Sequence, residues 1–385
     1  MKMSQKRKIV MIGPVFPYKG GISHYTGLLY RTLSKENDVT MISYKMQYPK
    51  LLFKKEQKDY SNGSFKIEDT QYLLNTANPI NIISVAAKIK KMKPDAVIIQ
   101  WWHPYFAPCY RILEAVLAKC NIIFVCHNVF PHERFPMDRF LTKMVLKRAN
   151  GYIVQSKMDA TDLLSVKADA NYVLTPHPTY NAFKLQDMTK VQARDILGKS
   201  ADEKVLLFFG FVRKYKGLSY LLKAMPDVLA GRKETDKVSL MVVGDFGEDK
   251  QEYLDSIQEL GIGNAVQLVE GYIPDREVEK YFAACDLVVL PYESATQSGI
   301  VQIAYGFEKP VVVTNVGGLP DVVDHGRTGY VVESQNPGKL AEAINDFWEN
   351  DRAVEMKQHI EEAAYKFSWD RMAEAIDKVL EDMHK

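Results

Sequence analysis

The chain has 385 residues, of which 46% are apolar and 25% are charged. That length exceeds one typical domain, so we expect two domains that each bury a core. The four cysteines show neither metal-ligand nor paired spacing, which predicts reduced thiols and a cytoplasmic location. No segment approaches the roughly 18–20 apolar residues of a membrane-spanning helix, and the basic start leads directly into a strand-like run.

The net charge of +2 conceals two halves of opposite sign. Residues 1–185 hold 27 Lys and Arg against 13 Asp and Glu, whereas the remainder of the chain has an excess of acidic residues. A basic first half favours anionic lipid, nucleic acid or phosphorylated substrates as partners. Its basic segments lack the interleaved stacking aromatics of a recognised nucleic-acid module, so no nucleic-acid partner is expected.

The first half alternates strand-like runs with helical patterns. The helical patterns cover 25–33, 80–92 and 110–119, and the strand-like runs are "KIVMIG", "DVTMIS", "DAVIIQ", "NIIFVC" and "GYIVQ". These runs show no apolar/polar alternation, which is typical of parallel strands covered on both faces.

The second half repeats this scheme, with helices between the runs "KVLLFFG", "VSLMVVG", "AVQLVEG", "DLVVL", "PVVVT" and "GYVV". Two prolines and a loss of periodicity mark a boundary within 174–183. We therefore predict an α/β protein of two Rossmann-like, doubly wound parallel-sheet domains, 1–180 and 181–365. The amphipathic segment at about 366–385 is expected to pack back on the first domain.

Ligands of open α/β sheets bind beyond the carboxyl ends of the strands, so the residues that follow each strand are candidates. Gly20 and Gly21 follow the first strand and precede a helix start near Ser23, whose amides suit an oxyanion. A glycine turn capped by Ser23 is the structural alternative. His127 follows "NIIFVC", where a histidine is either structural or functional.

Two further candidate loops follow strands of the second domain. Arg213 and Lys216 follow "KVLLFFG", where two cations suit a diphosphate and solvated loop charges are the alternative. Ser298 and Gly299 expose backbone amides at a helix start. Together with the glycine pair of the first domain, these residues predict a diphosphate clamp between the domains.

Sequence motifs for binding a metal ion or a nucleoside triphosphate are absent. It contains no Asp-x-Asp, no His/Cys/Asp cluster with metal spacing and no Walker lysine motif. Cations and helix amides would then neutralise a diphosphate, so we expect no metal and no cofactor.

At this point the sequence resembles the retaining glycosyltransferases of family 4, the group 1 type with the GT-B fold. That fold has two Rossmann-like domains facing across a cleft. The resemblance covers nearly the whole chain and rests on "GPVFPYKGGISHYTGLL", "CHNVFPHE", "FGFVRKYKGLSYLLKAM", "VVGD", "GYIPDREVEKYFAACDLVVLPY", "SGIVQIAYGFEKPVVVTNVGGLPDVVDHGRTGYVV" and "FSWDRMAE".

The resemblance implies catalytic roles for three residues. His127 would contact the donor sugar near the reacting carbon, while Arg213 and Lys216 would stabilise the leaving diphosphate. It also implies a set of donor-binding residues, which are Gly20, Gly21, Gly244, Ile273, Ser298, Gly299 and Ile300. Ile273 falls where backbone groups hold the nucleobase.

This sequence departs from the family pattern at two places. The family arginine lies five residues before the lysine, a position held here by Phe211, whereas Arg213 lies three before. The paired glutamates of the family fall on Ala295 and Ile303. Glu293 and Gln302 are the nearby donor-binding substitutes.

The resemblance implies transfer of a hexosyl unit from a UDP- or GDP-sugar, with retention of configuration, to a saccharide acceptor. We expect a polyprenyl-linked acceptor and a role in cell-surface polysaccharide or glycolipid synthesis. A sugar-nucleotide epimerase of the same architecture and a non-catalytic sugar-nucleotide-binding protein are the alternatives.

Three segments of the first domain, 48–60, 88–93 and 138–150, combine basic with apolar residues. Such a face suits peripheral attachment to the anionic inner leaflet of a membrane. Ordinary solvated helices are the alternative.

Overall fold

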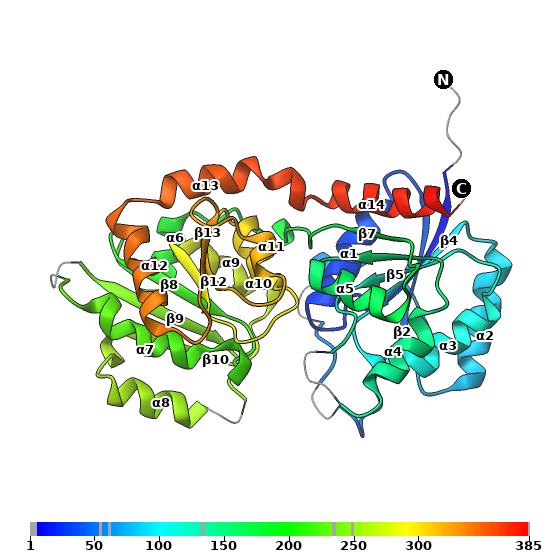
Figure 1. The fold of residues 1–385 in the computed structure, drawn as a ribbon, viewed down its shortest axis with the longest axis horizontal. Coiled ribbons are helices and arrows are strands. Elements are labelled where there is room, and N and C mark those ends of the chain that lie inside the picture. Colours follow the sequence, from blue (N-terminus) through cyan, green and yellow to red (C-terminus); the bar gives the residue numbers. More distant parts are fainter. Residues whose placement is uncertain are drawn as a thin grey trace. The chain divides into compact units, whose positions relative to one another are not determined.

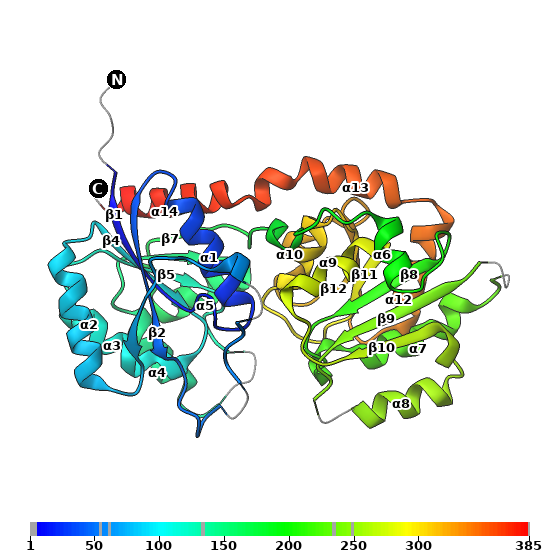
Figure 2. The same ribbon diagram turned by 180° about the vertical axis from the view of Figure 1, so that it is seen from behind.

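A computed structural model describes residues 6–53, 56–60, 63–131, 135–232, 236–247 and 250–383. The chain divides into two compact units. The first unit comprises 1–176 and 368–385, and the second comprises 177–367. Both units are α/β, with helices on both faces of a parallel sheet (Figures 1 and 2).

The first unit contains a seven-stranded parallel sheet in the order β3-β2-β1-β4-β5-β6-β7. Its strands are β1 (Lys8–Ile12), β2 (Asp38–Met46), β3 (Gln71–Asn75), β4 (Ala96–Trp101), β5 (Ile122–Cys126), β6 (Gly151–Val154) and β7 (Tyr172–Leu174). Its helices are α1 (Gly21–Leu33), α2 (Pro79–Met92), α3 (Ala107–Val116), α4 (Asp138–Leu146), α5 (Lys157–Val166) and α14 (Trp369–Asp382).

The five strands predicted in the first half all form, but β3 and β7 were not predicted. Both are edge strands, and most of their residues are only partly buried. The central strands β4 and β5 are buried along their whole length, which explains their continuous apolar runs. The short β3 and β7 lack that signal because most of their residues are partly exposed.

The closing helix α14 packs on α1, β6 and β7 of the first unit. Its apolar stripe is buried, and it consists of Met372, Ala375, Ile376, Val379 and Leu380. Gly151 at the start of β6 permits this close approach, because a Cβ there would overlap the side chains of Val379 and Met383.

The second unit contains a six-stranded parallel sheet in the order β10-β9-β8-β11-β12-β13. Its strands are β8 (Lys204–Phe209), β9 (Val238–Gly244), β10 (Val266–Glu270), β11 (Leu287–Leu290), β12 (Val311–Thr314) and β13 (Gly329–Val332), as predicted. Its helices are α6 (Lys190–Ile196), α7 (Leu218–Leu229), α8 (Lys250–Glu259), α9 (Asp275–Ala284), α10 (Gly299–Gly306), α11 (Leu319–Val322), α12 (Pro337–Glu349) and α13 (Ala353–Glu362).

The described ranges contain neither a candidate membrane-spanning helix nor a candidate metal cluster. No helix in them has the length and apolar character needed to cross a membrane. No group of three or more His, Cys, Asp or Glu in them is arranged to hold a metal ion. All four cysteines are free thiols, and three of them are buried.

Candidate functional site

The order of strands in the second sheet locates a site at its carboxyl edge. From β8 the chain winds outward through β9 to β10, and it then returns to β11 on the other side of β8. The loops after β8 and β11 therefore lead in opposite directions, which defines the topological switch point where open α/β sheets bind ligands. The loop after β8 carries Arg213 and Lys216, and the loop after β11 leads to Ser298 and Gly299.

Glycines bring the loops at this edge into close contact. Gly217 ends the short 3₁₀ helix η4 (Lys214–Lys216) with φ +68°, and a Cβ there would overlap the carbonyl oxygen of Pro291. Gly244 has φ +153°, and a Cβ there would overlap the carbonyl oxygen of Gly210. A larger residue at either glycine would push the loops apart.

Lys216 extends over the end of β8. Its ammonium lies 5.2 Å from the centroid of the Tyr292 ring, within cation–π range. A Cβ built on Gly210 would lie 3.4 Å from Lys216 Nζ and 3.6 Å from Ile300 Cδ1. The side chains of Lys216 and Ile300 thus lie beside the same glycine.

Arg213 lies on the β9 side of this loop. Its guanidinium is 5.8 Å from the Phe211 ring centroid, and Nη1 approaches the position of a Cβ on Gly247. Among the residues that the structure describes, no carboxylate forms an ion pair with Arg213 or Lys216. The neighbouring Lys214 differs, since it pairs with Glu252 at 3.6 Å.

Helix α10 begins at this edge without a side-chain cap. Ser298 occupies the N-cap position with no side-chain cap hydrogen bond, and the first turn contains no acidic residue. The Ser298 Oγ instead lies 3.4 Å from the Tyr292 hydroxyl oxygen. The backbone amides of the first turn carry the positive end of the helix dipole, which suits a negatively charged ligand.

Glu293 and Gln302, the two substitutes for the missing glutamates, differ in their exposure to solvent. Glu293 is partly exposed, and its backbone N–H donates to the Tyr215 carbonyl at 2.7 Å. Burial, and then the nearby Glu293 carboxylate, raises the pKa of the Tyr220 hydroxyl. Gln302 is only 1% exposed, so its side chain offers almost no accessible surface to a donor. Its donor-binding role stays a prediction.

The positions that hold glutamates in the family are apolar here and buried. Ala295 is 5% exposed and Ile303 is 7% exposed. A carboxylate at either position would lose most of its hydration in this packing. Ile273, the predicted nucleobase contact, lies in the loop after β10, whose Gly271 N–H donates to the Gly244 carbonyl at 3.0 Å.

In the first unit, His127 follows β5 directly. Its Nε2 donates to Gln100 Oε1 at 2.9 Å, and its ring packs edge-to-face on Tyr25 of α1 with centroids 4.6 Å apart. His127 is 8% exposed and Gln100 is fully buried. These contacts hold the imidazole rigidly beside α1.

The glycine pair lies at the amino end of the same helix. Gly20 is the N-cap of α1, with φ +104° and no side-chain cap, and Gly21 is its first residue. The helix therefore starts two residues before Ser23, so the structural alternative of Ser23 as the cap is wrong.

Sequence reasoning missed three residues that shape these sites. Gln100 holds His127, and its only signal was a polar side chain ending the buried run "DAVIIQ". Gly210 and Tyr292 lie beside Lys216. Neither had a signal beyond its place at a strand end, because the contact with Lys216 depends on how the two loops fold.

The second unit therefore presents two cations with no carboxylate partner among the described residues, together with an uncapped helix start, at a topological switch point. Such an arrangement can bind a multiply charged anion and stabilise negative charge that develops on it. Comparisons with known proteins show which fold and which protein family have these features.

The family described as "Glycosyl transferases group 1" matches residues 190–367, nearly all of the second unit. The second unit is thus similar to the group 1 glycosyltransferases over this region. It is 28% identical over 254 residues to D-inositol 3-phosphate glycosyltransferase of Corynebacterium jeikeium. That match covers 64% of this chain and spans only 60% of the relative's length.

Two further similarities extend over almost the whole chain. Spore coat protein SA of Bacillus subtilis is 24% identical, with 96% of both chains covered. The structure of HepE from Anabaena in complex with UDP superposes with a TM-score of 0.74, covering 97% of this chain and 100% of that one. At 18% identity, this structural likeness establishes the GT-B fold alone.

Proposed function

We propose that the protein transfers a hexosyl unit from a nucleotide diphosphate sugar to a saccharide acceptor, with retention of configuration. The observation that carries the proposal is the pair of cations, Arg213 and Lys216, which have no carboxylate partner in the described part of the chain and lie at the same sheet edge as an uncapped helix start. A diphosphate leaving group carries the charge that such a site neutralises.

In the proposed reaction, the bond between the anomeric carbon and the diphosphate oxygen breaks, and a bond to the acceptor hydroxyl oxygen forms on the same face of the sugar. Arg213 and Lys216 stabilise the charge that develops on the leaving oxygen. The acceptor proton passes to the departing diphosphate, so no dedicated protein base takes part. Retention, the family 4 assignment and independence from metal ions belong to the proposal.

The remaining predicted roles also belong to the proposal. The amides of Ser298, Gly299 and Ile300 hold the donor phosphates and sugar, and Ile273 borders the nucleobase. In the first unit, Gly20, Gly21 and His127 serve the donor sugar. The fixed orientation of His127, set by its bond to Gln100, supports this role.

Similar proteins support the donor class. The Corynebacterium relative is described as a glycosyltransferase acting on D-inositol 3-phosphate, and the Anabaena structure contains UDP. We propose a UDP- or GDP-sugar as donor and a saccharide, polyprenyl-linked at the cytoplasmic face of a membrane, as acceptor. The basic excess of residues 1–185 supports a location beside anionic lipid.

A thermal-shift screen of UDP-, GDP- and ADP-sugars tests the proposal. One donor should raise the melting temperature, because a ligand that binds only the folded state stabilises it. The Arg213→Ala variant should lose most of that shift. If no nucleotide diphosphate sugar stabilises the wild-type protein, the donor assignment is wrong.

A release assay then separates transfer from the alternatives. Nucleotide release that depends on an added acceptor extract supports transfer. Release without any acceptor would indicate the epimerase, and binding without release would indicate a non-catalytic binding protein.

A further inference from the structure

Five large apolar side chains of the first unit are exposed in two segments that lie near each other. We call this set the apolar rim. Its members and their exposed fractions are Leu51 (86%), Leu52 (63%), Phe53 (41%), Met137 (63%) and Phe140 (61%). Three belong to the connection after β2, and two lie at the start of α4. Exposed apolar groups of this size indicate an interaction surface.

The rim is held in place by an aromatic cluster. The Phe53 ring stacks on Tyr48 with centroids 5.7 Å apart, and Tyr48 packs on Tyr105 at 4.9 Å. The Gln57 side chain fixes Tyr48, because it accepts from the Tyr48 N–H and donates to the Tyr48 carbonyl. The first part of the rim is thus anchored to the 3₁₀ helix η2 (Pro104–Phe106).

The second part of the rim is anchored to the same element. Helix α4 packs against η2, and it buries Asp138, Thr142, Val145 and Leu146 while leaving Phe140 outside. The connection after β2 and the start of α4 lie on the same side of the first unit in both views (Figures 1 and 2). The rim is therefore one surface rather than two unrelated patches.

The charges that border the rim are mostly basic. Within 135–150, every exposed charged side chain is basic, namely Arg139, Lys143, Lys147 and Arg148, and the acidic Asp138 is 5% exposed. On the other segment Lys50 is exposed, and so is the acidic Glu56, which accepts from the Lys58 N–H at 3.1 Å. Lys45 is exposed near the end of β2. Lys54 and Lys55, which contributed to the predicted basic segment, lie outside the described residues.

We propose that the apolar rim inserts into the interfacial region of an anionic bilayer while its basic border binds the lipid headgroups. This proposal rests on the proposed function, since a lipid-linked acceptor requires the enzyme to reach a membrane. Apolar side chains inside a cationic border fit the boundary between acyl chains and anionic headgroups. A second copy fits poorly, because a symmetric contact would bring two cationic borders together.

The sequence suggested three segments for attachment to a membrane, and the structure distinguishes among them. In 88–93 the only large apolar side chains are Ile89, which is buried, and Met92, which packs against the core of the first unit. That segment offers lysines without an exposed apolar partner. The rim segments combine both features, so they carry the insertion.

Vesicle sedimentation of the full chain tests the rim. Wild-type protein should bind vesicles that contain phosphatidylglycerol at low salt and bind pure phosphatidylcholine vesicles much less. The double variant Leu51→Ser with Leu52→Ser should bind at least about tenfold more weakly, because each buried leucine contributes apolar transfer energy. Phe140→Ser should also weaken binding.

Matched exposed positions provide the controls. Ile80→Ser on α2 and Val354→Ser on α13 remove side chains that are 81% and 76% exposed, but neither belongs to the rim. Both controls should bind vesicles like the wild type. Equal loss in rim variants and controls, or no preference for anionic lipid, would overturn the proposal.

A tryptophan at Phe53 reports insertion directly. In Phe53→Trp, anionic vesicles should shift the emission to shorter wavelength, and brominated lipids should quench it, whereas Ile80→Trp should respond to neither. Unchanged Phe53→Trp emission in the bound protein would contradict insertion, as would a dimer that dissociates on rim substitution. The donor-induced thermal shift of the rim variants is measured without lipid. It tests the donor assignment separately from membrane insertion of the rim.

Discussion

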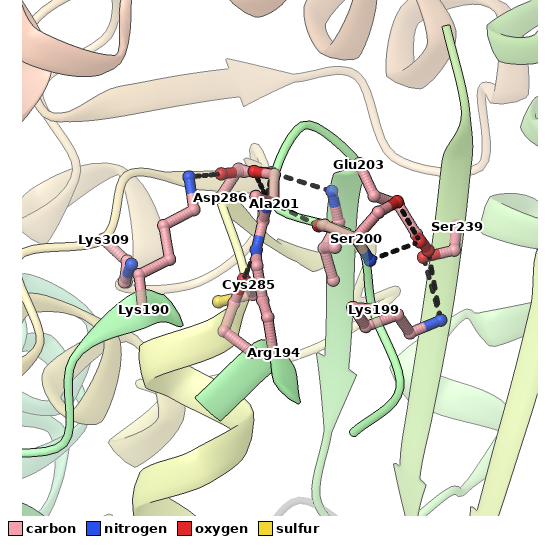
Figure 3. Close-up of polar contacts among 12 residues, drawn as sticks. Lys190, Arg194, Lys199, Ser200, Ala201, Glu203, Ser239, Cys285, Asp286 and Lys309 are labelled. Carbon is pink, nitrogen blue, oxygen red and sulfur yellow. Dashed lines mark hydrogen bonds and ion pairs between the residues drawn. The ribbon is translucent and has the colours of Figure 1, made fainter. Parts of the chain in front are cut away.

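Two pairs of cations at opposite edges of the second sheet differ in whether they form ion pairs. At the amino edge, Lys190 and Arg194 share the carboxylate of Asp286 at 2.5 and 3.0 Å (Figure 3). At the carboxyl edge, Arg213 and Lys216 have no carboxylate partner among the described residues. Folding thus neutralises Lys190 and Arg194 at the amino edge, whereas it leaves Arg213 and Lys216 without a carboxylate partner in the described ranges.

The amino edge satisfies its charges almost completely. Lys199 and Lys237 pair with Glu203 at 3.3 and 3.2 Å, and the Glu203 side chain is buried. Asp286 also accepts from the Val205 N–H at 2.8 Å, which ties α6 to the start of β8. A buried carboxylate with several donors stabilises local structure, whereas cations without a carboxylate partner in the described ranges can bind an anionic ligand at a switch point.

The largest effect is expected at the carboxyl edge. Lys216→Ala should lower turnover by about 10²–10³-fold, as removal of one preorganised charge stabiliser does in other enzymes. The loss arises because the leaving diphosphate would no longer have the ammonium beside it. Single-turnover release of nucleotide measures the effect.

Lys214→Ala is the matched control for this loop. Lys214 is exposed and already paired with Glu252, so its removal should leave turnover nearly unchanged. Near-normal turnover in Lys216→Ala would contradict the assignment of the site.

A stability effect is expected at the amino edge. Asp286→Asn should lower the free energy of unfolding by about 3 kcal/mol, because Arg194 would stay buried without its counter-charge. The Arg194 side chain is only 3% exposed. Denaturant unfolding measures the change, and turnover per folded molecule should stay the same.

Asp324→Asn serves as its control. Asp324 pairs with Arg327 at 3.4 Å, but both side chains are more than half exposed, so the stability should change little. If Asp286→Asn lowered turnover and left stability intact, the contrast between the two edges would be wrong.

Acid should destabilise the fold in part by protonating Glu203. Burial works to raise the pKa of Glu203, but hydrogen bonding from Ser239, the charges of Lys199 and Lys237 and the Ser200 amide outweigh it and lower the pKa to about 2. A carboxylate with a lowered pKa stabilises the fold above its unfolded value and loses that contribution as the pH falls toward 2.

The Glu203→Gln variant should therefore be less stable at pH 7, by on the order of 1–3 kcal/mol. The difference from the wild type should shrink between about pH 4.5 and pH 2. Unfolding curves across that range measure it, and a constant difference would contradict the lowered pKa.

Glu114 in the first unit has a raised pKa, in contrast to the lowered pKa of Glu203. It is 4% exposed, neither carboxylate oxygen has a hydrogen-bond partner, and burial raises its pKa to about 8 despite Arg111 and Arg148. The folded state then holds a proton that the unfolded state releases, so stability should fall as the pH rises from about 4.5 to 8. Glu114→Gln cannot ionise, so it should remove much of that decline, which is on the order of several kcal/mol at pH 8.

The contrast between central and edge strands shows what the sequence could predict of the fold. Continuous apolar runs located all six strands of the second sheet and the five inner strands of the first. The edge strands β3 and β7 escaped because tertiary pairing, rather than local composition, makes them strands.

The candidate site was predictable only in part for a related reason. Sequence order placed Arg213, Lys216 and Ser298 after strands that turned out to flank the switch point. It could not show that Gly210 lies beside both Lys216 and Ile300, or that Gln302 is buried. Those facts depend on how loops from distant strands meet.

The smallest effect is expected at Glu293, and it tests whether backbone amides and cations suffice at the carboxyl edge. Glu293→Gln keeps the side-chain shape and removes the charge beside Tyr220, so turnover should change by no more than about threefold. The pKa of Tyr220 should fall toward its ordinary value, because part of its elevation comes from the Glu293 carboxylate. Tyrosinate absorbance against pH measures the latter, with Tyr220→Phe as reference. A loss of 100-fold or more in turnover would show that Glu293 replaces a family glutamate, and that the site needs a carboxylate beside its unpaired cations.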